Sequence, residues 1–514
     1  VALMGANGSG KSTLLHVLIT NLVLWYPPDE VELYLIDFKK GVEFKTYATH
    51  VLPHARAIAI ESDREFGLSV LQRLDGEMER RGELFRAAGV QDLPSYRATT
   101  GRKLPRTLLV VDEFQVFFSE DDKIAQDAAI LLDRLVRQGR AFGIHIILGS
   151  QTLGGTSGLP RSTIGQMAVR IALQCSEVDS QLIFDDGNSA ARLLNRPGEA
   201  IYNDAGGLLQ GNSPFQTAWL SDEVRDDYLD RVTELARRQS RISEPPIVFE
   251  GNAPADLRRN PLLADLLRGG LSLTLADGSA RVWLGEAVAI KDPTAAVLRR
   301  QSGGNLLLIG QRDDAALAIF SAAMVGLAAQ HRSDSAQFIV LDGTSPESPH
   351  ALQRVAATLP QPTRFIEYRS MPEIMTELAD ELHRRQSQGT PSDPAIYLFM
   401  HGLQRYRLLR RSEDTFSFSS SGSEEDKPPA ADRLFTELLR EGPAVGIHVI
   451  AWADTPATVE RMFDRPTLRE FDNRVLFQMS ANDSSNLIDS PLANRLGFYR
   501  ALFFSEEQGL LEKF

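Results

Sequence analysis

Short apolar stretches alternate with longer amphipathic stretches along most of the chain, and the period of the pattern distinguishes the two. Runs of consecutive apolar residues predict buried strands, which are expected at 31–40, at 169–174 and within 107–118, where the strand is expected to end at Asp112 and Glu113. From about 63 to 87, apolar residues recur at helical spacing opposite a charged face, which predicts one long amphipathic helix. The repeated alternation of strand and helix predicts an α/β fold with a mainly parallel sheet flanked by helices.

The second half of the chain repeats the pattern of the first half. Gly5 and Asp37 recur as Gly310 and Asp342 at the same spacing. Further landmarks recur in the same order: the Arg-Arg pairs at 80–81 and 384–385, GIHII at 143–147 and GIHVI at 446–450, and the segments VRIALQCSEVDSQLI and NRVLFQMSANDSSNLI. We therefore predict tandem domains of one fold, separated by a proline-containing boundary. The expected division is 1–242, a linker with lead-in strands at 243–295, and 296–514 with a polar insertion at 412–430.

The stretch VALMGANGSGKST at 1–13 carries the strongest chemical signal. It contains the pattern G-x-x-x-x-G-K-S between apolar residues typical of a strand end and apolar residues at helical spacing, which indicates a P-loop. In such a loop, backbone N–H groups and the positive end of the following helix bind phosphates. Lys11 is expected to neutralise the β- and γ-phosphates of ATP, and Ser12 to bind Mg²⁺. The predicted nucleotide-binding residues are Gly5, Ala6, Asn7, Gly8, Ser9, Gly10, Lys11, Ser12 and Thr13.

Polar residues at the ends of two further predicted strands complete the expected site. Asp112 and Glu113 follow an apolar run, at the strand end where parallel sheets place their chemistry. In a P-loop enzyme, Asp112 would hold Mg²⁺ and Glu113 would polarise the attacking water. Gln151 ends another predicted strand, where its amide could sense the γ-phosphate. An exposed loop glutamine is the alternative for Gln151.

The second domain lacks these chemical groups. Ala315 and Ala316 occupy the Gly-Lys positions, while Asp313 and Asp314 add negative charges that repel phosphate. His401 stands where the first acidic residue of the pair is expected. We therefore predict tandem P-loop (RecA-like) domains of which the second is a degenerate, nonhydrolysing copy.

Composition and charge restrict the function classes. The net charge of -13 argues against a protein that coats nucleic acid, because attraction to phosphates needs the opposite sign. It leaves open a ring whose basic residues line a channel. A single cysteine, Cys175, excludes an internal disulfide and a cysteine-rich zinc site, consistent with a cytoplasmic protein. The chain starts without Met, so we expect upstream sequence through which a membrane could be contacted.

Five motifs of the first domain resemble those of the FtsK/SpoIIIE family of motor ATPases, within the wider HerA-FtsK group. They are the P-loop, LIDFKKGVEF, LLVVDEF, GRAFGIHIILGSQ and the segment that runs from RIALQC to GEAIY. The resemblance implies that Lys11 and Ser12 are Walker A residues, Asp112 and Glu113 the Walker B pair, and Gln151 the sensor. It also implies a hexameric ring, in which an arginine from a neighbouring subunit completes each site. Our first candidate for that arginine is Arg170, followed by Arg64 and Arg140, and each has a structural ion-pair role as its alternative.

The tandem layout looks like the EccC/EssC coupling ATPases of type VII secretion, in which some copies are also degenerate. Three hypotheses follow. The first is an ATP-driven ring motor that translocates double-stranded DNA, as the strand motifs suggest. The second is a type VII-like ATPase that moves protein substrates across a membrane. The third is a nucleotide-gated scaffold whose second domain recruits partners.

Overall fold

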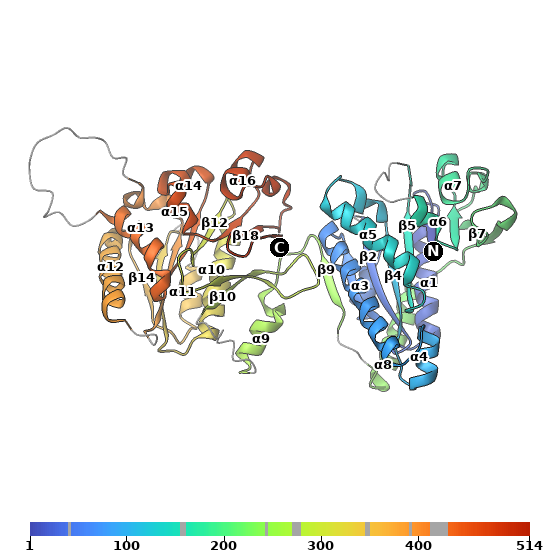
Figure 1. Cartoon of the computed structure of the whole chain (residues 1–514), viewed down its shortest axis with the longest axis horizontal. Coiled ribbons are helices and arrows are strands. Elements are labelled where there is room, and N and C mark those ends of the chain that lie inside the picture. The colour runs from blue at the N-terminus through green and yellow to red at the C-terminus, as the bar shows by residue number, and fades with distance from the viewer. Residues whose placement is uncertain are drawn as a thin grey trace, which may run out of the picture. The chain divides into compact units, whose positions relative to one another are not determined.

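The computed structural model describes residues 1–39, 43–154, 161–241, 245–269, 279–344, 350–389, 393–411 and 430–514 (Figure 1). The chain divides into two compact units, Val1–Ala253 with Val288–Ile290, and Pro254–Ala287 with Lys291–Phe514. The division at Ala253 falls within the expected linker, 243–295. The polar insertion expected at 412–430 lies outside the described residues, except for its last position.

Within the described part of the first unit, nine strands form one sheet with β1 in its interior. Strand β1 pairs in parallel with both β5 and β6. Strands β7 and β8 add antiparallel pairs at one edge, and the other neighbours are parallel. In spatial order the strands are β8 (Ser213–Gln216), β7 (Glu199–Asn203), β6 (Arg170–Leu173), β1 (Ala2–Met4), β5 (Ile144–Ser150), β4 (Arg106–Asp112), β2 (Val31–Asp37), β3 (Ala55–Ile60) and β9 (Ile247–Glu250).

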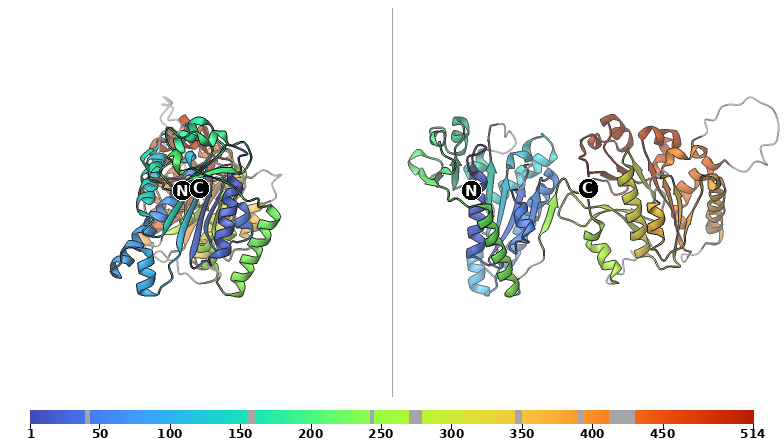
Figure 2. Two further views of the ribbon diagram at one scale, coloured as in Figure 1. Left: turned by 90° about the vertical axis from the view of Figure 1, so that its right-hand side faces the viewer. Right: turned by 180° about the vertical axis from the view of Figure 1, so that it is seen from behind.

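Helices cover both faces of this sheet (Figures 1 and 2). Helices α3 (Arg64–Ala87) and α5 (Lys123–Gln138) pack together on one face, and α1 (Lys11–Trp25) and α8 (Asp222–Arg238) pack together on the other. Helix α3 confirms the predicted amphipathic helix. Alternate residues of β2 enter two separate cores, which explains why the central strands are apolar on both sides. The shorter helices are α2 (Lys45–Thr49), α4 (Leu93–Thr100), α6 (Arg161–Gly165) and α7 (Glu177–Ile183), with 3₁₀ turns η1 (Phe114–Phe118), η2 (Ala190–Leu193) and η3 (Leu209–Gly211).

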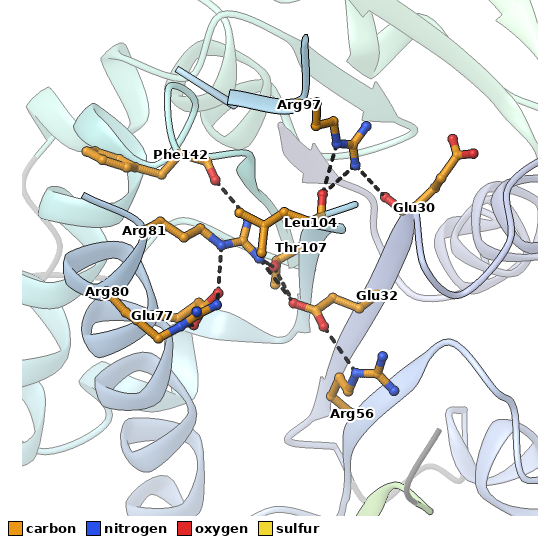
Figure 3. A network of polar contacts seen from close by, with 10 residues as sticks. All are labelled: Glu30, Glu32, Arg56, Glu77, Arg80, Arg81, Arg97, Leu104, Thr107 and Phe142. Carbon is orange, nitrogen blue, oxygen red and sulfur yellow. Dashed lines mark hydrogen bonds and ion pairs between the residues drawn. The ribbon is translucent and has the colours of Figure 1, made fainter. Parts of the chain in front are cut away.

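The fully buried Arg81 of α3 braces the edge of the sheet at which β2 and β4 begin (Figure 3). Its guanidinium donates hydrogen bonds to Glu77 at 2.7 Å, to the Thr107 hydroxyl at 3.0 Å and to the Phe142 carbonyl at 2.8 Å. The Thr107 hydroxyl donates in turn to Glu32 at 2.6 Å. Because each of the three guanidinium nitrogens of Arg81 has a hydrogen-bond partner, the buried charge is tolerated. The network stabilises the scaffold at the sheet edge remote from the acidic ends of β2 and β4.

The second unit contains a sheet of eight strands and a separate hairpin among its described residues. The hairpin pairs β10 (Ala280–Gly285) with β11 (Thr294–Leu298). In spatial order the sheet comprises β14 (Thr363–Phe365), β13 (Ala336–Asp342), β15 (Ala395–His401), β16 (Ile447–Ala453), β12 (Leu306–Ile309), β17 (Asn473–Leu476), β18 (Leu502–Ser505) and β19 (Leu510–Lys513).

Helices also flank this second sheet. Helix α12 (Met371–Gln388) packs on α13 (Ala431–Glu441), and α10 (Asp313–Gln330) packs on α11 (Ala351–Ala356) (Figure 1). By length and composition, α10 alone among the described helices is apolar enough to cross a membrane, but it packs against the hairpin strand β10 and forms part of a hydrophobic core. The remaining elements are α9 (Pro261–Leu267), α14 (Pro456–Met462), α15 (Arg465–Arg469) and α16 (Ala481–Ile488), with 3₁₀ turns η4 (Leu257–Arg259), η5 (Tyr368–Ser370), η6 (Leu403–Arg405), η7 (Arg407–Leu409), η9 (Pro443–Val445) and η10 (Leu492–Arg495).

The two units share one topology, which confirms the predicted internal repeat. Apart from β9, the strands of the first sheet run β3-β2-β4-β5-β1-β6-β7-β8, and those of the second run β14-β13-β15-β16-β12-β17-β18-β19. These are the same chain orders. The buried Arg385 repeats Arg81, since it donates to Glu381 at 2.7 Å and to the Val445 carbonyl at 3.1 Å. Both units are therefore α/β folds with mainly parallel sheets flanked by helices.

Candidate nucleotide-binding site

The P-loop connects β1 to α1 at the edge of the sheet where the parallel strands end. Gly8 and Gly10 adopt positive φ angles of 79° and 100°, which L side chains rarely tolerate. At Gly10 a side chain would also lie 3.0 Å from the backbone nitrogen of Gly198. Helix α1 starts at Lys11 with no side-chain cap and no acidic residue in its first turn. No residue of its own first turn therefore neutralises the positive end of the helix, which suits an anionic phosphate.

The structure brings the predicted Walker residues together. The buried Lys11 ammonium pairs with Asp112 and also lies 3.0 Å from Oε1 of Glu113. Burial raises the pKa of Asp112, and the adjacent Lys11 charge opposes that rise. The three residues come from the start of α1 and the end of β4. A cation and two carboxylates thus converge beside the N-terminus of a helix, as phosphate and metal binding require.

Glu113 is held in an unusual backbone conformation with its carboxylate directed by neighbours. Its φ of 57° and ψ of 46° lie in the left-handed region, which is costly for a residue with a side chain. Oε2 accepts hydrogen bonds from Gln115 Nε2 at 2.6 Å and from the backbone N–H of Gln151 at 3.2 Å. Gln115 is in turn bonded by the Ser150 hydroxyl at 2.8 Å. The main chain of Gln151 contacts Glu113. The role of the Gln151 side chain as a sensor stays a prediction.

The groups around Ser12 and Asp112 fit a magnesium-bound triphosphate. Oxygen ligands are those that Mg²⁺ prefers, and Ser12 and Asp112 supply them from adjacent elements. The Ser9 hydroxyl and Oδ2 of Asp37 are buried without a partner among the described residues. Both groups can therefore still form hydrogen bonds where the strands end. Burial raises the pKa of Asp37 to about 7.

Three further residues contribute to this site through contacts that the sequence does not show. Glu43 accepts a hydrogen bond from the Ser12 hydroxyl at 3.0 Å, Gly198 donates its N–H to the Ser9 carbonyl at 2.8 Å, and Gln115 orients Glu113. Each is distant in sequence from the P-loop or lies outside the Walker patterns, so only folding reveals its contact. The turn residue Gly198 could have been suspected from its place in the segment NRPGEA.

The three candidate arginines differ sharply in their surroundings. Arg170 is buried and donates to the carbonyls of Met167 at 3.3 Å and Ile183 at 3.2 Å, among others. Arg64 is bound to Asp122 at 2.8 Å. Arg140 is exposed, and its guanidinium has no hydrogen bond or ion pair among the described residues. Arg170 thus has a structural role within its own unit, and a role of any of the three in trans stays a prediction.

The equivalent position in the second unit is filled by its own side chains. Helix α10 begins with Asp313, whose Oδ1 lies 3.5 Å from Nε2 of the fully buried His401. The His401 ring lies 4.6 Å from that of Trp452, and the Trp452 N–H donates to the Gly310 carbonyl at 3.0 Å. Burial lowers the pKa of His401, which favours a neutral ring. Among the described residues, this position of the second unit has neither a phosphate-binding lysine nor a magnesium-binding carboxylate pair.

Residues 1–155 match the model of the FtsK/SpoIIIE family. They form an FtsK/SpoIIIE-family domain. Over 160 residues the chain is 37% identical to the ESX-5 secretion system protein EccC5 of Mycobacterium marinum, a match that covers 29% of this chain and 11% of EccC5. It is 29% identical over 267 residues to the DNA translocase FtsK of Sporosarcina ureae, covering 49% of this chain and 32% of that protein. In both relatives the match covers a minor part of their own length.

Longer matches extend over both units. The ESX-4 secretion system protein EccC4 of Mycobacterium tuberculosis is 25% identical over 528 residues, which cover 91% of this chain and 40% of EccC4. The cytoplasmic domain of the type VII secretion ATPase EccC from Thermomonospora curvata superposes with a TM-score of 0.62 at 22% identity, covering 98% of this chain and 60% of that one. This structural likeness shows a shared tandem α/β fold. The chain spans less than half the length of the curated relatives it matches.

Proposed function

We propose that the first unit binds ATP with Mg²⁺ and hydrolyses it to power the movement of a polymer. The observation that carries this proposal is the convergence of Lys11, Asp112 and Glu113 at the uncapped start of α1. In the reaction, Lys11 and the P-loop N–H groups bind the phosphates and stabilise the charge that develops on them. Ser12 and Asp112 would hold the metal, which neutralises phosphate charge. Glu113, fixed by Gln115 and the Gln151 backbone, accepts the proton of the attacking water.

The chain has to exchange its internal ion pairs for contacts to phosphate before it can react. Lys11 pairs with both carboxylates in the structure. A bound triphosphate gives Lys11 a stronger anionic partner. A metal ion likewise gives the Asp112 carboxylate a stronger cationic partner. Glu113 is then free to orient a water molecule. ATP binding and assembly of the site are in this way one event.

For the polymer, the tandem layout favours a protein substrate. The alignment with EccC4, a secretion system protein, covers both units, whereas the alignment with the DNA translocase FtsK covers 49% of this chain. A second unit with the topology of the first and without its phosphate-binding groups is most simply explained as a part that serves a partner or a substrate. Double-stranded DNA is the second candidate, supported by the 29% identity to that DNA translocase over 267 residues. Both candidates imply a homo-oligomeric ring.

The deciding experiment measures Mg²⁺-dependent ATP hydrolysis by the full chain with and without long duplex DNA, over a series of salt concentrations. A protein-moving ATPase is expected to show the same rate with and without DNA. A rate that rises with DNA and falls steeply with salt would favour the DNA translocase. The absence of any ATP hydrolysis in fresh, assembled protein would contradict the proposed function itself.

A further inference from the structure

A chain of polar contacts connects the hydroxyl of Ser12 to a buried tyrosine. The Ser12 hydroxyl donates to Oε1 of Glu43 at 3.0 Å. The second carboxylate oxygen of Glu43 lies 3.5 Å from Nε2 of His16, and Nδ1 of His16 lies 2.7 Å from the Tyr47 hydroxyl. Ser12 and His16 are one turn apart on α1, so they present their side chains on the same face. Glu43 precedes α2 and Tyr47 belongs to it, so the contacts join the two helices.

The far end of this series of contacts is buried. Tyr47 is fully buried and the His16 side chain is 10% exposed, with ring centroids 5.6 Å apart. Tyr47 also packs near Phe44 at a centroid distance of 6.2 Å. The Glu43 side chain is 33% exposed, so it lies at the boundary between this packed region and the nucleotide site. His16 and Tyr47 thus limit the positions that the Glu43 carboxylate can adopt.

The donor direction of the Ser12 hydroxyl has a chemical consequence. A serine hydroxyl has one proton and two lone pairs. When its proton points to Glu43, both lone pairs are available to a cation on the other side. Groups that bind metals are commonly oriented in this way by an outer carboxylate. Without such an acceptor, the hydroxyl rotates freely and binds the metal only in a fraction of its orientations.

We propose that Glu43 is a positioning residue that aims the Ser12 hydroxyl at the nucleotide-bound Mg²⁺, and that His16 and Tyr47 hold Glu43 in place. The proposal rests on the proposed function of the first unit as an Mg²⁺-dependent ATPase. It goes further because it assigns control of metal affinity to residues outside the Walker motifs. If Glu43 had a purely structural role and only fastened its loop to α1, its loss would lower nucleotide affinity equally with Mg²⁺ and in EDTA.

The test measures binding of a fluorescent ADP analogue to the full chain as a function of Mg²⁺ concentration and, separately, in EDTA. In Glu43→Ala the Mg²⁺ concentration at half-saturation is expected to rise about 10- to 100-fold. Affinity in EDTA is expected to stay that of wild type, since no metal is present to be positioned. Glu43→Gln retains an acceptor oxygen and is expected to recover most of the Mg²⁺ affinity. Glu83→Ala, which removes an exposed carboxylate of α3, is the matched control and is expected to change neither value.

A double-mutant cycle tests the proposal independently of absolute affinities. In a Ser12→Ala background there is no hydroxyl to orient, so adding Glu43→Ala is expected to leave the Mg²⁺ half-saturation unchanged. Tyr47→Phe, which removes only the hydroxyl at the far end, is expected to give a smaller rise than Glu43→Ala. This variant supplies a second measurement if Glu43→Ala folds poorly.

Two results would overturn the inference. One is a Glu43→Ala variant with the Mg²⁺ half-saturation of wild type. The other is a variant that loses nucleotide affinity equally with Mg²⁺ and in EDTA, as a structural role requires. Either result leaves the proposed ATPase function intact, provided that the wild-type chain binds the Mg²⁺-nucleotide complex. A wild-type chain that binds no nucleotide under either condition would overturn the inference and the proposed function together.

Discussion

Arg170 of the first unit and Arg474 of the second unit make equivalent contacts with their own backbone. Nε of each donates to the carbonyl three residues earlier, Met167 at 3.3 Å and Phe471 at 2.9 Å. Nη1 of each donates to the carbonyl thirteen residues later, Ile183 at 3.2 Å and Leu487 at 2.8 Å. Since the second unit lacks the phosphate-binding residues, this arrangement does not depend on nucleotide chemistry.

We therefore expect Arg170→Ala to destabilise the first unit by about 2–4 kcal/mol, because it leaves buried carbonyls without a donor. Arg474→Ala is the matched control and is expected to cost the second unit a similar amount. Chemical denaturation of the full chain measures both. If Arg170→Ala instead keeps wild-type stability and specifically abolishes turnover in the assembled protein, Arg170 acts across a subunit boundary after all.

Substitutions of Lys11 and Glu113 are expected to impair different steps, nucleotide binding and hydrolysis respectively. Lys11→Ala removes the charge over the phosphates and should abolish nucleotide binding. Glu113→Gln keeps the size of the side chain and removes the proton acceptor, so ATP should bind and turnover should drop by at least about 100-fold. Equilibrium binding and steady-state hydrolysis separate the two effects. Wild-type turnover in Glu113→Gln would show that another group activates the water.

Hydrolysis is expected to depend on assembly. Arg64 and Arg170 are held by contacts within the first unit. We therefore expect the completing arginine to come from a neighbouring chain. The rate per chain should then rise with protein concentration and reach a plateau. Arg140→Ala, at an exposed position, provides a variant for the same titration. Full specific activity in a dilute monomer, verified by light scattering, would exclude this dependence.

One nucleotide is expected to bind per chain at saturation. In the second unit, Asp313, His401 and Trp452 occupy the position that corresponds to the phosphate site. Asp313 adds a negative charge that repels triphosphate, whereas Asp314 is ion-paired with Arg312 at 2.9 Å. Isothermal titration calorimetry should give a stoichiometry of about one for wild type and none for Lys11→Ala. Two tight sites per chain would show that the second unit binds nucleotide. Removal of the residues after Ile290, which retains all of the first unit, is expected to change turnover, because a retained fold without its chemistry implies a regulatory or structural use.

Acid is expected to destabilise the first unit through His54. Burial lowers the pKa of this histidine to about 4, and its Nε2–H donates to the Tyr26 carbonyl at 2.7 Å while Nδ1 is buried without a partner among the described residues. The unfolded chain binds a proton near pH 6.5 and the folded chain does not, so the free energy of unfolding falls as the pH drops from 6.5 towards 4. The contribution between pH 7.5 and pH 5 is about 2 kcal/mol.

Denaturation of His54→Gln at the two pH values checks this expectation. Glutamine can donate to the Tyr26 carbonyl without titrating, so the variant should lose about 2 kcal/mol less than wild type on acidification. His448, whose pKa burial also lowers to about 4, is expected to act in the same direction in the second unit. If the pH dependence of His54→Gln equals that of wild type, the pKa of His54 is not lowered in the folded state.

Much of the architecture is predictable from the amino-acid sequence. The alternation of apolar strands with helices specifies an α/β fold, and the recurrence of Gly5 and Asp37 as Gly310 and Asp342 reveals the duplicated topology. Such patterns are local, because the spacing of apolar residues within one segment indicates whether it forms a strand or a helix. The P-loop is local as well, since its strand, glycines and helix are contiguous in the chain.

The tertiary structure alone decided which side chains serve these motifs. Glu43 reaches Ser12 across 31 positions and Glu113 reaches Lys11 across 102, so no local pattern reports either contact. Arg170 is a plausible partner in trans by sequence, because the sequence shows its charge but not the carbonyls that surround it. Sequence determined which elements form and which chemistry is present in this protein. Folding determined which groups are paired, because pairing depends on distances between residues that only the packed sheet and helices bring together.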